Sequence, residues 1–133
     1  MYRAPVDEIT HALKAVSGLG EAIDDGKGGD LSVDLIDAIL EEAGKFATDR
    51  IAPLHLPSDR QGSRLDDGQV TTPEGWKRAY LDWIEGGWNA LPGPEDHGGQ
   101  GLPMSMAMAA MEMWNSGSIA FALCPMLTMG AIE

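Results

Sequence analysis

A few side chains stand out in this sequence as candidates for acid–base, nucleophilic or metal chemistry. They are His11, His55, His97, Glu95, Asp96, Glu112 and Cys124. The three histidines lie far apart in the sequence, and none has a second ligand at a spacing typical of metal sites. No Ser–His–Asp order, nucleophile elbow or phosphate-binding P-loop is present. The sequence therefore predicts no metal site and no familiar nucleophilic site.

The carboxylates allow two interpretations each. Glu95 and Asp96 are adjacent, so their side chains diverge; we expect them to hydrogen-bond the backbone of the following glycine turn, with proton transfer as the alternative. Glu112 is the only charged residue between Asp96 and Glu133. We expect its carboxylate to accept hydrogen bonds from backbone N–H groups or to pair with a segment outside this chain. A role for Glu112 as catalytic base is the weaker alternative. We assign no catalytic residue.

Cysteine usage and charge limit the classes of partner. Cys124 is the single cysteine, lies in an apolar run and is expected to be a small core residue, which is typical of a reducing, cytoplasmic compartment. The net charge is −12, and no Lys or Arg follows Arg78. This argues against nucleic acid and anionic membranes, and the last third of the chain offers no cation for a pyrophosphate. The turn at residues 98–101 also lacks the preceding strand of a dinucleotide fingerprint.

Helical periodicity predicts the elements that position these groups. We expect an all-α, up-down bundle of about five helices and no strand. The expected helices are residues 5–16, a helix capped by Ser32 that ends or kinks at Pro53, residues 72–85 with Thr72 as the N-cap, residues 103–114, and a last helix from Ile119. Residues 56–72 are expected to be polar loop. Trp76, Tyr80, Trp83 and Ile84 form a stripe that we interpret as core packing, with a ligand platform as the alternative.

The last two helices are rich in methionine, and seven of the eight Met residues lie between Met104 and Met129. These helices are apolar on nearly every side, and five helices cannot cover all of that surface. We expect them either to pack on an absent domain or to line an apolar pocket. Polar residues interrupt the uncharged run 113–132, which favours buried helices over a membrane span. The last helix has no C-terminal cap at Glu133, which predicts a chain truncated within a helix.

The loop before these helices resembles a known family. Its sequence, Pro94-Glu95-Asp96-His97-Gly98-Gly99-Gln100-Gly101-Leu102, is similar to the P-E-x-x-G-G-x-G-L loop of acyl-CoA dehydrogenases. The preceding GGWNAL segment, residues 40–47 and residues 51–54 are similar as well. The resemblance covers residues 31–133 and implies the family's N-terminal helical domain, with residues 1–30 as an extension helix and linker. The start, Tyr2-Arg3-Ala4-Pro5, resembles a long-form subgroup that includes broad-range bacterial and 3-methylmercaptopropionyl-CoA dehydrogenases.

The resemblance implies a function for the parent protein. Members of the family are FAD-dependent oxidoreductases of lipid metabolism and fatty acid β-oxidation that convert acyl-CoA to trans-2-enoyl-CoA. They pass electrons to an electron-transfer flavoprotein, and a homo-oligomer is expected; the acyl-CoA oxidase branch stays open. The family's catalytic glutamate and flavin-binding parts have no counterpart in this chain. We therefore expect the fragment alone to bind no FAD and to be inactive.

Four residues of the last helix are implied to bind substrate. By their position after the loop motif, Phe121, Ala122, Pro125 and Met129 would face the acyl chain. Their offsets place them on one side of a helix. The alternative is a stand-alone helical module that binds a protein partner or a lipid and has no catalytic activity. The reading frame beyond Glu133 would distinguish the two.

Overall fold

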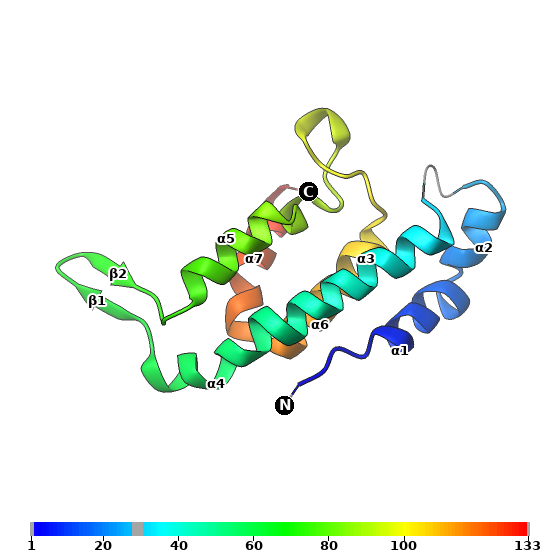
Figure 1. The fold of residues 1–133 in the computed structure, drawn as a ribbon. Coiled ribbons are helices and arrows are strands. Elements are labelled where there is room, and N and C mark those ends of the chain that lie inside the picture. Colours follow the sequence, from blue (N-terminus) through cyan, green and yellow to red (C-terminus); the bar gives the residue numbers. More distant parts are fainter. Residues whose placement is uncertain (1, 28–30, 133) are drawn as a thin grey trace.

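The computed structural model describes residues 2–27 and 31–132, and helices dominate it (Figure 1). The elements in chain order are α1 (Val6–His11), the π-helical turn η1 (Ala12–Val16), α2 (Leu19–Asp24), α3 (Val33–Phe46), the π-helical turn η2 (Ala47–Ile51), α4 (Ala52–Gln61), β1 (Arg64–Asp66), β2 (Gln69–Thr71), α5 (Trp76–Glu85), the 3-10 turns η3 (Trp88–Ala90) and η4 (Glu95–His97), α6 (Met104–Gly117) and α7 (Ile119–Ile132). The predicted all-α class is confirmed. None of the described helices has the length and apolar character required to cross a membrane.

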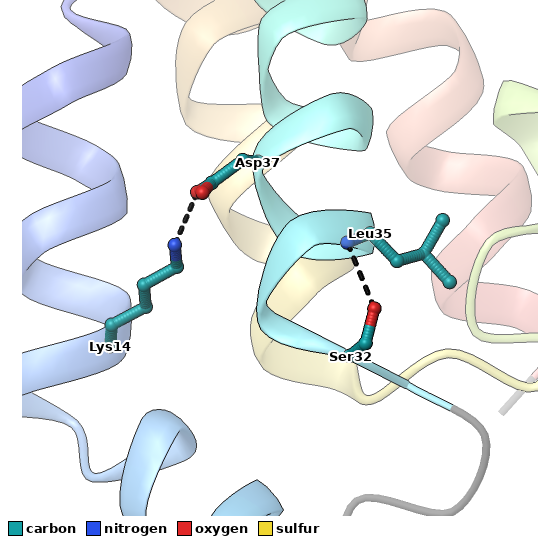
Figure 2. A network of polar contacts seen from close by, with 4 residues as sticks. All are labelled: Lys14, Ser32, Leu35 and Asp37. Atoms are coloured by element: carbon teal, nitrogen blue, oxygen red, sulfur yellow. Dashed lines mark hydrogen bonds and ion pairs between the residues drawn. The ribbon is translucent and has the colours of Figure 1, made fainter.

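The long helix α3 begins where its capping residue predicts. The hydroxyl of Ser32 accepts a hydrogen bond from the Leu35 N–H at 3.1 Å, and Lys14 of η1 forms an ion pair with Asp37 one turn further on (Figure 2). Helical spacing predicts an apolar stripe of six residues along this helix; Val33 at its start is exposed, and the other five are fully buried. They are Ile36, Leu40, Ala43, Ala47 and Ile51. Spacing alone therefore identified the face of α3 that packs against α6.

The helix does not end at Pro53, which corrects the first half of the prediction that it ends or kinks there. The chain passes through the π-helical turn η2 and continues as α4 to Gln61. Pro53 lies in the first turn of α4, where a proline ring is tolerated, and η2 accommodates the change in hydrogen-bond pattern just before it. The helix therefore extends far enough to bring Ser58 against the start of α5.

Two further sequence predictions fail in the segment that joins α4 to α5. Residues 56–72 are not plain loop, because they contain the end of α4 and an antiparallel hairpin in which Leu65 is opposite Val70. Helix α5 begins at Trp76, after Gly75 in the left-handed region, and Thr72 does not cap it. The short helix α2 was also not predicted. Helix α5 then runs back along α3 and α4, since Trp76 meets Ser58 while Asp82 pairs with Arg50 at 2.7 Å.

Aromatic rings fill the centre of the molecule. Trp114 of α6 is 1% exposed and contacts Trp83 and Trp88 edge-to-face, with ring centroids 5.6 Å and 5.4 Å away. Its indole N–H donates to the Ala43 carbonyl at 3.3 Å, which ties α6 to α3. Edge-to-face pairs add to the free energy gained by burial. This cluster joins α3, α5 and α6 into one core.

The N-terminal segment belongs to the same core. The Tyr2 hydroxyl donates to the Met113 carbonyl at 3.0 Å, and the Ala4 N–H donates to Thr48 Oγ1 at 3.1 Å. Ile9 and Leu13 belong to the core cluster. Residues 2–16 therefore pack across α3 and α6 and do not form a detached extension. The boundary predicted at residue 30 lies outside the described residues.

The hydrogen bond of Tyr2 leads to a pH-dependent prediction. Burial raises the pKa of Tyr2, the hydrogen bond with Ser116 opposes the rise, and the Glu112 carboxylate adds to it. Because the folded pKa exceeds the unfolded value, the stabilisation is present below the ordinary tyrosine pKa and is lost as pH rises through the folded pKa. Tyr2→Phe is expected to cost about 1 kcal/mol at neutral pH and to flatten the alkaline loss. Urea unfolding at neutral and alkaline pH measures the cost and the pH dependence. If the variant loses stability with rising pH as steeply as the parent, the role of Tyr2 is contradicted.

Candidate functional site

Helix α7 has a buried side and an open side. Phe121 is 3% exposed, Ala122 and Pro125 are buried, and Met129 is half-buried, so these four residues lie on the side that faces the rest of the molecule. Sequence spacing predicted that they share one side. Their surroundings place the candidate site between α7 and the helices beneath it.

A small apolar cavity lies between α5 and α7. Its volume is about 370 Å³, and it is lined by Thr72, Trp76, Lys77, Tyr80, Phe121 and Cys124. We call it the α5–α7 cavity. Of the four predicted substrate-binding residues only Phe121 lines it, while Ala122 and Pro125 pack in the protein interior. The volume is at the small end of the range for ligand pockets, which suits an apolar group such as part of an acyl chain.

Hydrogen bonds fix the aromatic wall of the α5–α7 cavity. The Trp76 indole N–H donates to the Ser58 hydroxyl, which donates in turn to the Leu54 carbonyl. The Trp76 ring meets Phe121 edge-to-face, with centroids 6.0 Å apart. Because the indole is held at its polar end, its apolar face stays turned toward the cavity. The wall is therefore preorganised.

Sequence reasoning missed two features of this cavity. The stripe was interpreted as core packing. Trp83 is fully buried and Tyr80 packs half-buried against the core, but Trp76 is a half-buried wall of the cavity and Ile84 is exposed. Cys124 was expected in the core, yet it is exposed and lines the cavity. Both differences follow from the way α7 crosses α5. The alternative of a ligand platform on α5 stays a prediction, and the position of Trp76 and Tyr80 in the cavity wall is consistent with it.

The opposite side of α7 is apolar and uncovered. Its exposed residues are Ile119, Leu123, Met126 and Leu127, with Met104 and Met108 on α6. The surplus apolar surface predicted from the methionine-rich helices is therefore present. We call this surface the open face of α7. An apolar surface of this kind is typical of a contact with further protein or an apolar ligand.

The glycine loop before α6 is closed by its own backbone. The N–H groups of Gly99, Gln100 and Gly101 donate to the carbonyls of Pro94, Ala90 and Gly93 at 2.9, 2.8 and 2.9 Å. These donors are therefore already used within the loop. Since no Lys or Arg follows Arg78 either, this loop offers neither the free donors nor the cations that the phosphates of FAD would need.

The loop carboxylates do not take the role that we favoured. Among the described residues, neither Glu95 nor Asp96 accepts a hydrogen bond from the glycine turn. Oδ2 of Asp96 lies 4.0 Å from Nε2 of His97, and Asp96 and His97 are both exposed. The 3-10 turn η4 satisfies that backbone without them. Glu112 is exposed on α6 beside Tyr2, so water solvates it.

The structure keeps the remaining candidate groups apart. His11 lies on α1, His97 in the exposed loop, and His55 on α4 with its Nδ1 3.4 Å from Ser118 Oγ. Within residues 2–27 and 31–132, no three His, Cys, Asp or Glu side chains gather in a way that could hold a metal ion. The geometry therefore directs attention to the α5–α7 cavity.

Fold and site together define a helical domain whose last helix has an apolar cavity on one side and an uncovered apolar face on the other. Residues 35–133 match the family described as acyl-CoA dehydrogenase, N-terminal domain. The chain belongs to the acyl-CoA dehydrogenase family, as the loop motif predicted.

Two curated relatives agree with this assignment. The chain is 41% identical over 132 residues to 3-methylmercaptopropionyl-CoA dehydrogenase of Ruegeria pomeroyi, which covers 99% of this chain and 22% of the relative. It is 27% identical over 113 residues to the broad-specificity linear acyl-CoA dehydrogenase of Mycobacterium tuberculosis, which covers 84% of this chain and 18% of the relative. The chain thus spans about a fifth of the length of these relatives.

Proposed function

We propose that this chain is the N-terminal part of a flavin-dependent acyl-CoA dehydrogenase that oxidises acyl-CoA to trans-2-enoyl-CoA. In this proposal residues 31–133 form the family's N-terminal domain, and residues 1–30 precede it as an extension. The α5–α7 cavity carries the proposal, because it is an apolar space of suitable size within the matched domain. The names of both relatives, which are acyl-CoA dehydrogenases, support the reaction class.

The rest of the enzyme would have to come from elsewhere. We assign no catalytic base to this chain, and the family's flavin-binding parts have no counterpart in its sequence, so the chain alone is expected to be inactive. Its contribution is to exclude water from the substrate and to shape the space for the acyl group. The open face of α7 would be covered by other parts of the protein or by a neighbouring subunit in a homo-oligomer. An electron-transfer flavoprotein would receive the electrons.

The four substrate-binding residues have distinct proposed roles on α7. Phe121 supplies the wall of the α5–α7 cavity, and Ala122 is small enough to let α7 lie close to its neighbours. Pro125 lacks an N–H, so it cannot donate to the Phe121 carbonyl one turn earlier in the helix. Met129 lies outside the lining of the α5–α7 cavity and packs half-buried against the core, where its flexible side chain would adjust to an acyl chain that extends beyond the cavity. A wall of this kind selects substrates by size.

A substitution at Phe121 tests this role. In the full-length enzyme, Phe121→Trp is expected to lower kcat/KM about tenfold for the longest acyl-CoA that the enzyme accepts, with little change for the shortest. The larger ring fills space that a long chain would need. Phe121→Leu is expected to have the opposite effect. Initial rates with a series of straight-chain acyl-CoA substrates measure the profile.

Leu127→Trp provides the matched control. Leu127 lies on the opposite side of α7 and is 66% exposed in this chain, so a Trp there should leave the chain-length profile unchanged even where it disturbs the cover of the open face and lowers stability. A profile that shifts with Leu127→Trp and not with Phe121→Trp would move substrate to the open face of α7. A full-length product that carries no flavin, does not oxidise acyl-CoA and yet binds fatty acid would support the alternative of a lipid-binding module.

A further inference from the structure

The hairpin formed by β1 and β2 has no role in the proposed function. It extends beyond the helices (Figure 1), and all six of its strand residues are exposed. Leu65 and Val70 form an apolar cross-strand pair on one face, with 74% and 68% of their surface exposed. A two-stranded hairpin is only marginally stable by itself. An exposed apolar pair on such an element favours contact with another molecule.

The turn determines which backbone groups are free. Asp67 and Gly68 both have positive φ, at 44° and 76°, which is the two-residue turn that a right-twisted hairpin prefers. Asp66 and Gln69 close this turn. Since hydrogen-bonding groups alternate along an antiparallel strand, the N–H and C=O of Leu65 point to the outer edge of β1. A second strand could hydrogen-bond there.

The charges on β1 indicate which strand could pair with its outer edge. Arg64 and Asp66 flank Leu65 on the opposite face of the strand, and neither forms an ion pair with any described residue. The order positive, apolar, negative is complementary to itself when read in the reverse direction. A parallel copy in the same register would instead place Arg64 against Arg64.

We propose that β1 pairs antiparallel with β1 of a second copy of this chain, about a two-fold axis at Leu65. The two Leu65 residues would exchange both backbone hydrogen bonds, and each Arg64 would face Asp66 of the other copy. The resulting four-stranded sheet gathers two Leu65 and two Val70 side chains on one face. The outer strand β2, Gln69–Thr71, is uncharged, so it has no such complementarity.

This contact is small, which determines how it must be detected. Two hydrogen bonds and two exposed ion pairs hold it, so salt is expected to weaken it. Covalent trapping suits a weak contact. Paired residues in an antiparallel ladder have Cα atoms about 5.5 Å apart, within the range that a disulfide spans. Leu65→Cys in a Cys124→Ser background of the full chain therefore traps the proposed pairing, and the dependence of trapping on the charges at residues 64 and 66 distinguishes it from other encounters.

Charge exchange gives the decisive experiment. In the trapping background, Arg64→Asp makes β1 negative at both positions and Asp66→Arg makes it positive at both. Each variant alone is expected to form about tenfold less disulfide dimer than the parent in a glutathione buffer. Their equal mixture is expected to form mainly the heterodimer, resolved with a size tag, and the double exchange R64D/D66R is expected to restore trapping.

The controls make every result informative. Arg60→Asp makes the same charge change on α4, outside the strand, and is expected to leave trapping unchanged. The proposal is overturned if the parent does not trap, if the single variants trap as well as the parent, or if the mixture shows no preference for the heterodimer. Circular dichroism of each variant confirms that trapping is compared between folded proteins.

Discussion

Trp114→Ala is expected to lower the free energy of unfolding by about 4 kcal/mol, the largest effect of any single change considered for this chain. Trp114 is 1% exposed and lies between Trp83 and Trp88, so its removal leaves a large cavity and breaks two edge-to-face contacts. It also leaves the Ala43 carbonyl without its indole donor. Denaturant unfolding followed by circular dichroism measures the loss.

A pair of Phe variants separates the hydrogen bond from the packing. Trp114→Phe removes the bond to Ala43, whereas the Trp83 indole nitrogen is buried without a hydrogen-bond partner among the described residues. The donor of Trp83 therefore gains nothing in the folded state, and Trp83→Phe is expected to cost about 1 kcal/mol less than Trp114→Phe. Equal costs for the two Phe variants would contradict this account, as would a loss under about 2 kcal/mol for Trp114→Ala.

Gly99→Ala is expected to cost about 3 kcal/mol. A Cβ at residue 99 would lie 2.0 Å from the carbonyl oxygen of Gly93, which is backbone held by the loop's own hydrogen bonds. The overlap can be relieved only by separating the two halves of the loop that leads into α6. Thermal and denaturant unfolding measure the stability, and hydrogen exchange at Gly101 and Leu102 measures the opening of the loop.

Gly98→Ala is the matched control for the loop. Gly98 has a φ of +81°, but an added Cβ there has no atom within 4 Å. Its replacement should cost only the strain of a left-handed residue, about 1 kcal/mol. If both alanine variants lose the same amount, backbone conformation and not close approach would explain the glycines of this loop.

The sequence was most informative where one side of a helix is polar. Ile36, Leu40 and Ile51 recur at helical spacing among charged neighbours, so their burial and the packing face of α3 could be predicted. The loop motif identified the family because its glycines are needed by the conformation of the loop itself; at Gly99, for example, the backbone approaches Gly93 too closely for a side chain. The helix was expected to end or kink at Pro53, and it does not end there. A proline in the first turn of a helix is tolerated, and no pattern in the sequence marked the start of α4.

The hairpin could have been predicted, and the site could not. Asp67-Gly68 flanked by Leu65 and Val70 is a recognised hairpin signal, but the polar residues around it favoured loop. Helix α7 presents the opposite difficulty. Because it is apolar on every side, periodicity carries no information about which side is buried, and only its packing on α6 and against Trp76 of α5 separates the wall at Phe121 from the open face. The exposure of Cys124 follows from that packing too.

The contact between Tyr2 and Met113 has a consequence for biosynthesis. The two residues are 111 positions apart, so the N-terminal segment leaves the ribosome long before the helix that it packs against has been made. The N-terminal segment can pack against α3 as soon as that helix has been made, but its contacts with α6 form only later. Apolar surface of the N-terminal segment therefore stays incompletely covered until α6 has left the ribosome. We expect newly made chains to be clients of chaperones that act at the ribosomal exit tunnel.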